Sequence, residues 1–452
     1  MRLGWLLSMA PQLRQSDGAV SFASHPGRSG LGLADQGDGD LGLRTTSTPA
    51  AGPATSPVAT SDRIWAIDAL RGFALFGVLA INLHTEFRVS LFEQFLAPPA
   101  MGRTDRVAAA FLSFAFEFKA ISLFSLLFGV GLAIQHERLA RNPRRALLLV
   151  RRLLALLLFG LIHLFLIWNG DILTEYALAG FVVLPLLFAP AGMSLIAAAA
   201  LLLAYVMLAF VPLPFSFPDA AWLNDHVTMA RHVYSGGSVA GILRFRIAEL
   251  PEIAKLLAYI FPRTLALILF GAWLWRSGAI RKLAEHKRAL LIGGLMLVGS
   301  GLLLTAQDKG YVALIRIGPL SGFGTRFAYG ALDDLAPILV AFGYAALMLL
   351  ASGFPTARAA LQWAVPVGRT AFSNYILQSV ILGLLFYDYG LGLMGRIGPA
   401  ACLAIACAIY AAQAWLSAIW LRRHRFGPLE WLWRSLMYGK AQPWLRPITD
   451  RG

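Results

Sequence analysis

The chain has 452 residues, of which 58% are hydrophobic and only 14% are charged, and it carries a formal net charge of +15. A soluble domain has about 25% charged residues, so this composition excludes an ordinary soluble protein. The basic excess lies mainly in connections between apolar blocks, which argues against a nucleic-acid partner.

The first sixty residues differ in kind from the rest. They are rich in Gly, Ser, Ala, Pro and Asp and show no apolar periodicity. Such a segment cannot bury enough apolar surface to fold, so residues 1–60 are predicted to form a disordered extension. A polytopic transmembrane domain over 61–425 and a cytoplasmic tail over 426–452 are predicted to follow.

The apolar residues after position 60 gather in blocks of about 18 to 24, the length with which a helix crosses about 30 Å of hydrocarbon. A backbone in lipid must satisfy its own hydrogen bonds, which favours helices. The predicted fold class is therefore all-α, a polytopic membrane helical bundle of about ten transmembrane helices. The predicted spans are 65–84, 110–135, 146–168, 172–190, 193–212, 256–275, 288–306, 331–352, 370–388 and 398–421.

Lys and Arg cluster after spans two, six and ten, within 138–152, 276–288 and 422–440. All three clusters lie on one side only if the span number is even and both termini are cytoplasmic. We therefore predict a multi-pass protein of the cell (inner) membrane with this orientation. The longest connection, 213–255, then lies outside. Leu429–Tyr438 is predicted to be an amphipathic helix at the interface.

Polar residues within the spans are candidates for function, because a charge at hydrocarbon depth costs several kcal/mol. At 1.5 Å per residue, Asp68 and Arg71 fall near the cytoplasmic end of span one. Most of the others are predicted in the outer half, and no cytoplasmic set is as rich. These outer residues are Asn82, His84, Glu117, Lys119, His163, Asp171, Glu175, Tyr176, Arg263, Asp333 and Asp334.

Structural explanations compete with function for each of these residues. Arg71 could reach the cytoplasmic headgroups, as basic side chains near helix ends do. Glu117 and Lys119, two residues apart, point to different sides of a helix, and the span could instead begin after Lys119. His163 could simply bond to a neighbouring helix.

The remaining candidates have similar alternatives. Arg263, beside Pro262, could pair with a carboxylate to close the bundle. Asp333 and Asp334 could be N-terminal helix charges favoured by the macrodipole. Asn374 and Gln378 share one face of span nine, and side-chain amides commonly pack helices together in membranes.

The run Arg63–Ala74, continuing to Asn82, resembles the opening of the DUF418 (YeiB-like) membrane proteins. The resemblance covers essentially everything after residue 60 and implies a polytopic membrane protein, without a firmly assigned activity. Further matching blocks are Glu117 and Lys119 before 123–129, Gly160 to Tyr176 around His163, 368–379 and 426–431.

The Asp68-x-x-Arg71-Gly72-x-Ala74 opening is also similar, more distantly, to transmembrane acyltransferases of the acyltransferase-3 and heparan-glucosaminide acetyltransferase groups. Those enzymes take an acyl group from a cytoplasmic thioester to a sugar hydroxyl or amine on the far side. The acyltransferase-3 pattern has a histidine eleven residues after the arginine. Here that position is Asn82, as in the heparan-glucosaminide group, which leaves His163 or His84 as the candidate base.

The similarity implies a coherent chemistry. Histidine supplies a base near pH 7, and Asp171 or Glu175 is placed to orient it. Arg71 and the basic loops would hold the phosphates of an acyl-CoA donor, and Arg263 or Lys119 would stabilise negative charge. No bound cofactor is predicted. The sequence contains no metal-ligand spacing and no phosphate-binding glycine loop.

The predicted function is acyl transfer to a small-molecule, glycan or lipid acceptor in the envelope or for export. The predicted catalytic residues are His163, Asp171 and Glu175. The predicted substrate-binding residues are Asp68, Arg71, Asn82, Glu117, Lys119, Tyr176, Arg263, Asn374 and Gln378. The alternatives are a transporter using the same groups as a translocation or proton path, and a structural or regulatory membrane protein. The sequence sets no oligomeric state.

Overall fold

The computed structural model describes residues 60–96, 100–208, 213–312 and 322–446, so the predicted disordered extension lies outside the described residues except for its last position. Within these ranges the chain forms helices joined by short connections. Its single isolated β-bridge joins His424 to Leu445. The all-α prediction is confirmed.

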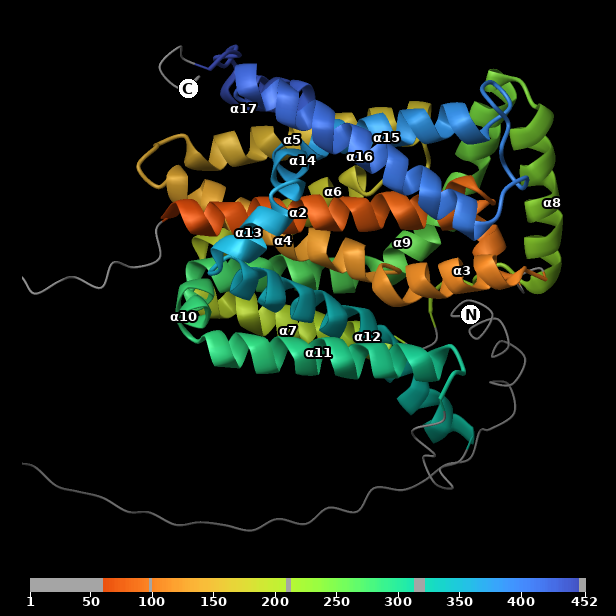
Figure 1. Ribbon diagram of the computed structural model, residues 1–452, viewed down its shortest axis with the longest axis horizontal. Helices are drawn as coiled ribbons and strands as arrows, with labels where there is room; N and C mark the ends of the chain where they lie inside the picture. Colours follow the sequence, from red (N-terminus) through yellow and green to blue (C-terminus); the bar gives the residue numbers. More distant parts are fainter. Residues whose placement is uncertain (1–59, 97–99, 209–212, 313–321, 447–452) are drawn as a thin grey trace, which may run out of the picture.

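Each predicted span overlaps an apolar helical segment in the described ranges (Figure 1). Within the described ranges, seven are long and apolar enough to cross a membrane. They are α2 (Thr60–Asn82) with η1 (Leu83–Phe87), α3 (Arg103–Ala115) with α4 (Lys119–Arg138), α5 (Arg145–Ile162) with η3 (His163–Ile167), α9 (Val239–Arg276), α11 (Lys287–Asp308), α12 (Gly322–Ala351) and α16 (Pro399–Arg423). Three are shorter, namely α6 (Leu173–Phe188), α7 (Ala191–Met207) and α15 (Ala371–Phe386).

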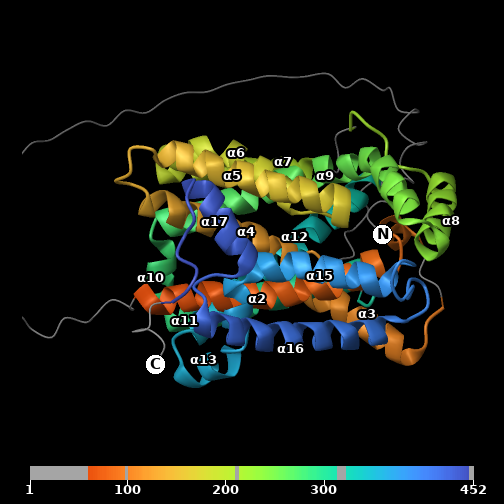
Figure 2. The same ribbon diagram turned by 90° about the horizontal axis from the view of Figure 1, so that it is seen from above.

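Shorter elements connect and cover these helices. They are η2 (Leu91–Phe95), α8 (Ala220–Gly236), α10 (Ala279–Glu285), α13 (Pro355–Leu361), α14 (Ala364–Arg369) and α17 (Pro428–Tyr438). In the view turned by 90°, α5 and α6 lie on one side of the bundle and α16 on the other (Figure 2). One core cluster joins α2, α15 and α16, and a second joins α4, α5, α6 and α9.

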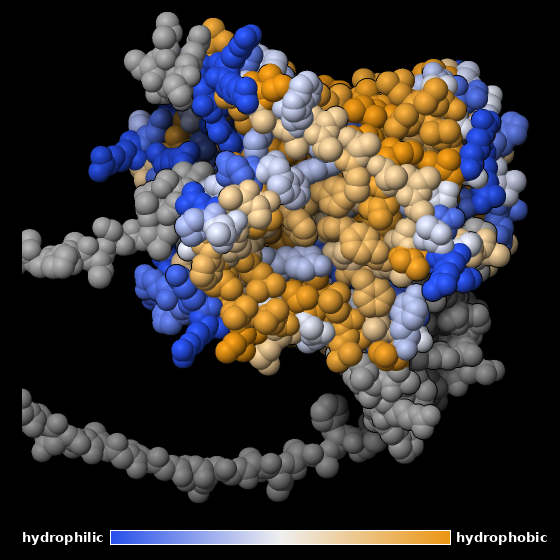
Figure 3. All heavy atoms as spheres, in the orientation of Figure 1, coloured by the Kyte–Doolittle hydropathy of each residue, from blue (hydrophilic) through white to orange (hydrophobic). Residues whose placement is uncertain are grey.

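The outer surface is that of a membrane protein. Large apolar side chains such as Ile196 (71% exposed) and Met296 (68% exposed) face outward. An apolar band covers the middle of the visible face, and hydrophilic residues gather at its two ends (Figure 3). An apolar exterior of this extent is expected of a surface that contacts lipid.

The two ends of the bundle differ in charge. The α4–α5 connection, α10 and α17 lie towards the same end, on the left of Figure 1, and they carry the three clusters of Lys and Arg. We call this the basic end, and the opposite end, where α8 lies, the far end. Assignment of the basic end to the cytoplasm stays a prediction.

One sequence-based expectation about helix continuity is wrong. Span two is not one helix, because α3 stops at Ala115 and α4 starts at Lys119. Phe118, between them, has φ 58°, a left-handed conformation that a bulky residue rarely adopts. The segment 213–255, predicted only as the longest connection, is mostly helical. It forms α8 and the first part of the 38-residue helix α9.

Asp334 is not the N-terminal helix charge that the sequence allowed. Helix α12 begins at Gly322, so Asp334 does not belong to the first turn and cannot act on the macrodipole there. Instead it is buried, and its carboxylate accepts a 3.0 Å hydrogen bond from the hydroxyl of Tyr205 on α7. The carboxylate therefore ties α12 to α7.

Candidate functional site

His163 lies where α5 passes into the single π-helical turn η3. Such turns inside helices are frequent at functional sites, because they shift side chains out of the regular α-helical register. The turn ends at Trp168, whose backbone is extended, and the chain then reverses into α6. This reversal brings Asp171 back to His163.

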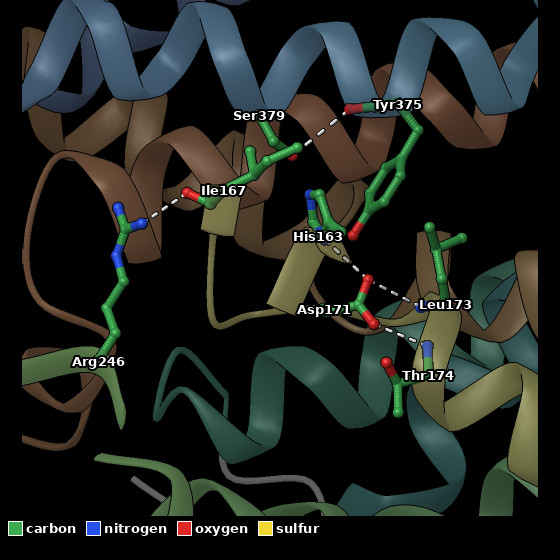
Figure 4. Close-up of polar contacts among 8 residues, drawn as sticks. All are labelled: His163, Ile167, Asp171, Leu173, Thr174, Arg246, Tyr375 and Ser379. Carbon is green, nitrogen blue, oxygen red and sulfur yellow. Dashed lines mark hydrogen bonds and ion pairs between the residues drawn. The ribbon is translucent and has the colours of Figure 1, made fainter. Parts of the chain in front are cut away.

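His163 and Asp171 form a buried pair in which neither side chain is exposed (Figure 4). His163 Nδ1 lies 2.8 Å from Asp171 Oδ1. The carboxylate also accepts hydrogen bonds from the backbone amides of Leu173 (3.1 Å) and Thr174 (2.7 Å), in the first turn of α6. Asp171 is thus held by three donors when Nδ1 carries the proton.

The second ring nitrogen of His163 is available for chemistry. With the proton on Nδ1, Nε2 carries a lone pair, and this buried atom has no hydrogen-bond partner among the described residues. A carboxylate that orients one imidazole nitrogen and leaves the other as an acceptor is the arrangement in which histidine acts as a general base. The sequence predicted Asp171 or Glu175 as the carboxylate that orients His163, and the structure places Asp171 there.

Tyr375 and Arg246 contact the π-helical turn that carries His163. The ring of Tyr375, on α15, lies 5.1 Å from that of His163. Arg246 on α9 donates a 2.7 Å hydrogen bond to the carbonyl of Ile167, at the end of η3 (Figure 4). The π-helical turn is therefore fixed both by a neighbouring aromatic ring and by a buried guanidinium.

Glu175, Tyr176 and Arg263 continue the buried polar region along α6 and α9. Glu175 is 3% exposed, and it interacts electrostatically with Arg263, which is 2% exposed. The Arg263 guanidinium lies over the rings of Phe118 and Tyr205, 5.6 and 5.9 Å from their centroids. The Tyr176 hydroxyl lies 2.9 Å from that of Ser125 on α4. Neither His163 nor Arg263 faces lipid.

A cavity of about 390 Å³ leads from the basic end towards this region. Among the described residues that line it, six are arginines: Arg71, Arg138, Arg152, Arg369, Arg425 and Arg434. Its walls include Phe124, Leu127 and Phe128, and its inner boundary includes Leu173, Tyr176 and Tyr375. The cavity therefore passes from a cationic rim to an apolar interior beside His163, and Tyr375 touches both the cavity and that histidine.

Two carboxylates line the same cavity, and each already has partners. Asp68 lies 3.2 Å from Arg71. Glu430 of α17 accepts from the backbone amides of Phe372 (2.8 Å) and Ser373 (3.1 Å), at the start of α15. Burial raises the pKa of Glu430 and lowers that of Arg434. Among the described lining residues, these two carboxylates therefore stand against six arginines.

This cavity adds a set of charged residues to the polar set predicted for the outer half, and that outer set itself stays a prediction. The densest gathering of charged side chains around a cavity lies at the basic end. The predicted interfacial helix is present as α17, but it packs over the cavity. Trp433, expected at headgroup level, lines the cavity and donates a 2.8 Å hydrogen bond to the carbonyl of Arg152.

Several predicted substrate-binding residues lie elsewhere. Asn374 donates to Thr370 and to Ser417 of α16, and Gln378 donates to Gln413 of α16. Both amides therefore join α15 to α16, which is the packing role such residues commonly have in membranes. Asn82 is half-buried at the end of α2.

Glu117 and Lys119 form a separate cluster at the α3–α4 break. Glu117 lies 3.1 Å from Lys309 of α11, and the Lys119 ammonium donates a 2.7 Å hydrogen bond to the carbonyl of Ser113. His84, the other candidate base, lies in η1. Its buried Nδ1 has no partner in the part of the chain that the structure describes, so no carboxylate orients that nitrogen there.

Comparison with known proteins places the chain in a family. It is 36% identical to the Bacillus subtilis protein called "Uncharacterized protein YxaH", across 86% of this chain and 97% of the relative. It is 30% identical to the Escherichia coli protein called "Uncharacterized protein YeiB", across 83% of this chain and 97% of the relative. The family profile described as "Protein of unknown function (DUF418)" matches residues 274–440. The chain belongs to the DUF418 family. No solved structure matches it.

The DUF418 profile and the full-length relatives cover different parts of the candidate site. The profile covers α10 to α17, which carry Tyr375, Glu430 and half of the cavity arginines. His163 and Asp171 precede it, in the region that only the full-length relatives cover. The candidate site of this DUF418 protein is therefore built from both parts of the chain.

Proposed function

We propose that this DUF418 protein is a transmembrane acyltransferase that takes an acyl group from acyl-CoA at its basic end and gives it to a hydroxyl-bearing acceptor. The observation that supports this most is the oriented His163–Asp171 pair beside the inner boundary of an arginine-lined cavity. In this proposal the basic end faces the cytoplasm, where the donor is found.

The charge of the cavity suits the donor. Coenzyme A carries phosphates, and guanidinium groups bind phosphate through planar pairs of N–H donors. Arg369, Arg425 and Arg434 all line the cavity near α17. The pantetheine arm is an uncharged chain, and the apolar walls beyond the arginines offer it and the acyl group a matching surface. The donor would therefore enter with its thioester directed towards Tyr375 and His163.

The proposed reaction uses His163 twice. First, Nε2 takes the proton of the acceptor hydroxyl while the oxygen forms a bond to the thioester carbonyl carbon. Next, the carbon–sulfur bond breaks, and the leaving thiolate takes that proton from His163. Asp171 keeps the ring oriented and stabilises the imidazolium between the two steps. General-base catalysis of this kind contributes about 10²- to 10⁴-fold.

The proposal is tested with the full-length protein purified into lipid nanodiscs and given acetyl-, octanoyl- and palmitoyl-CoA, with glycerol as the hydroxyl acceptor. We expect release of free thiol from at least one donor, and at least a hundredfold loss of that rate in His163→Ala. His84→Ala is the matched control, because it removes another histidine whose Nδ1 no carboxylate orients. Both variants are compared at equal expression and equal thermal stability. Equal rates in wild type and His163→Ala would refute the proposed role.

Transport is the second candidate, and the interrupted helix favours it. Helices broken within the membrane are typical of transporter binding sites, and the α3–α4 break holds the buried Lys119. Proteoliposomes containing a pH-sensitive dye separate the two functions. Proton movement without thiol release would favour transport, whereas thiol release without proton movement would favour the enzyme.

A further inference from the structure

Three buried polar atoms in and near His163 are unpaired in the described part of the structure. His163 Nε2, the Tyr375 hydroxyl and Glu86 Oε2 are buried, and none has a hydrogen-bond partner among the residues that the structure describes. They come from three different elements, η3, α15 and η1. Buried polar atoms in native proteins are nearly always hydrogen-bonded, so a group of unpaired ones indicates a place for a polar ligand.

The packing brings these three side chains to one place. The Tyr375 ring lies 5.1 Å from that of His163 and 43° from its plane. Trp168 packs 6.1 Å from the His163 ring and 4.9 Å from the ring of Phe87, the residue after Glu86. Thus the π-helical turns η1 and η3 meet through Trp168, with Tyr375 beside them.

Gly170 leaves space for the Glu86 carboxylate. A Cβ atom at position 170 would lie 2.4 Å from Glu86 Oε2 and 2.2 Å from the Trp168 ring. Any other residue would therefore displace the carboxylate or the indole. The loop that carries Asp171 towards His163 also makes room for Glu86, so the two carboxylates belong to one arrangement.

We propose that Glu86 and Tyr375 form, with His163, the subsite that holds the hydroxyl group of the acceptor, and that the acceptor is a neutral polyol or sugar at this point. This inference rests on the proposed acyltransferase function. A tyrosine hydroxyl can donate to the acceptor oxygen and a carboxylate can accept from a neighbouring hydroxyl, which places the reacting O–H at Nε2.

The route to the subsite follows from exposure. His163 has no exposed surface, whereas Glu86 and its neighbour His84 are only half-buried. Tyr375 faces the donor cavity. An acceptor would thus arrive past Glu86 while the donor arrives past Tyr375, and the two reacting groups would meet at His163.

The experiment uses glycerol as the hydroxyl probe and full-length protein in bilayers, labelled with ¹⁵N-histidine. The Nε2 resonance of His163 is assigned by its loss in His163→Gln. We expect glycerol to shift this resonance saturably in wild type, and about tenfold more glycerol to be needed in Tyr375→Phe and in Glu86→Gln. That change corresponds to about 1.4 kcal/mol. Tyr410→Phe is the control, because its buried hydroxyl donates to the Gly72 carbonyl (2.7 Å) on α2.

A parallel assay measures thiol release from acyl-CoA against glycerol concentration, together with equilibrium binding of CoA. Both variants should need more glycerol, and Glu86→Gln, whose side chain does not line the donor cavity, should bind CoA as tightly as wild type. A resonance that glycerol never moves, or moves equally in wild type and both variants, overturns the subsite. If glycerol shifts the resonance as expected but wild type releases no thiol, the subsite stands and the acyltransferase proposal fails.

Discussion

The Asp171→Asn substitution tests whether Asp171 orients His163, because it replaces one carboxylate oxygen with an NH₂ group. Oδ1 of Asp171 faces His163 Nδ1 (2.8 Å) and the Leu173 amide (3.1 Å), while Oδ2 faces the Thr174 amide (2.7 Å). An asparagine must place its NH₂ group at one of these two positions. Either placement leaves at least one buried backbone donor facing another donor.

The two placements have different consequences. If NH₂ faces Thr174, the histidine tautomer is kept, and one unpaired buried amide costs about 1–3 kcal/mol of stability. If NH₂ faces His163, the ring must turn Nδ1 into an acceptor, so Nε2 carries the proton and can no longer act as a base. In serine proteases, the same aspartate-to-asparagine change beside the catalytic histidine lowers kcat by about 10⁴-fold.

We therefore expect Asp171→Asn to lose activity by about 10²- to 10⁴-fold and stability by about 1–3 kcal/mol. Thiol release from acyl-CoA and thermal unfolding in the same nanodiscs measure both. Glu175→Gln is the matched control, because Glu175 is an equally buried carboxylate four residues along the chain that makes no contact within ion-pair distance of His163 in the described structure. Unchanged thiol release in Asp171→Asn would refute the orientation argument.

Three further outcomes are expected. Arg369→Ala should raise the Kd for CoA about tenfold, or about 1.4 kcal/mol, while Arg281→Ala on the exposed helix α10 should leave it unchanged, as measured by calorimetry. Burial raises the pKa of Glu430, so the folded chain keeps a proton that the unfolded chain releases. The thermal midpoint should therefore fall as pH rises from the ordinary glutamate pKa of about 4.3 through the raised value, and Glu430→Gln should remove this decline. Gly160→Ala should cost about 1–3 kcal/mol and reduce thiol release, because its Cβ would lie 2.6 Å from the Thr174 backbone nitrogen, while Gly192→Ala, with open space around it, should change neither.

The spans and the His163–Asp171 pair could be predicted because both depend on local sequence. Apolar blocks of membrane length fix the helices. His163 and Asp171 are only eight residues apart, and the Asn-Gly-Asp turn returns the chain towards the histidine. Glu117 and Lys119 flank the left-handed Phe118 and left open a span that begins after Lys119, but no glycine or asparagine marks the turn itself.

The cavity could not be predicted, because its parts are distant in sequence and each has another explanation. Arg152, Arg369 and Arg434 follow or flank apolar spans, where a basic residue is expected for topology alone. Only the folding of α17 over α5 and α15 shows that they share one space. The role of Tyr375 could not be predicted either, because aromatic residues are common on packed helix faces.

The claim that the arginine-lined cavity and His163 form one site is tested most directly by electron cryomicroscopy of the full-length protein with a non-hydrolysable thioether analogue of octanoyl-CoA. We expect phosphate density beside Arg369 and Arg434 and the thioether sulfur beside Tyr375, next to His163. Analogue density elsewhere on the protein, with the cavity unchanged and empty, would contradict the claim.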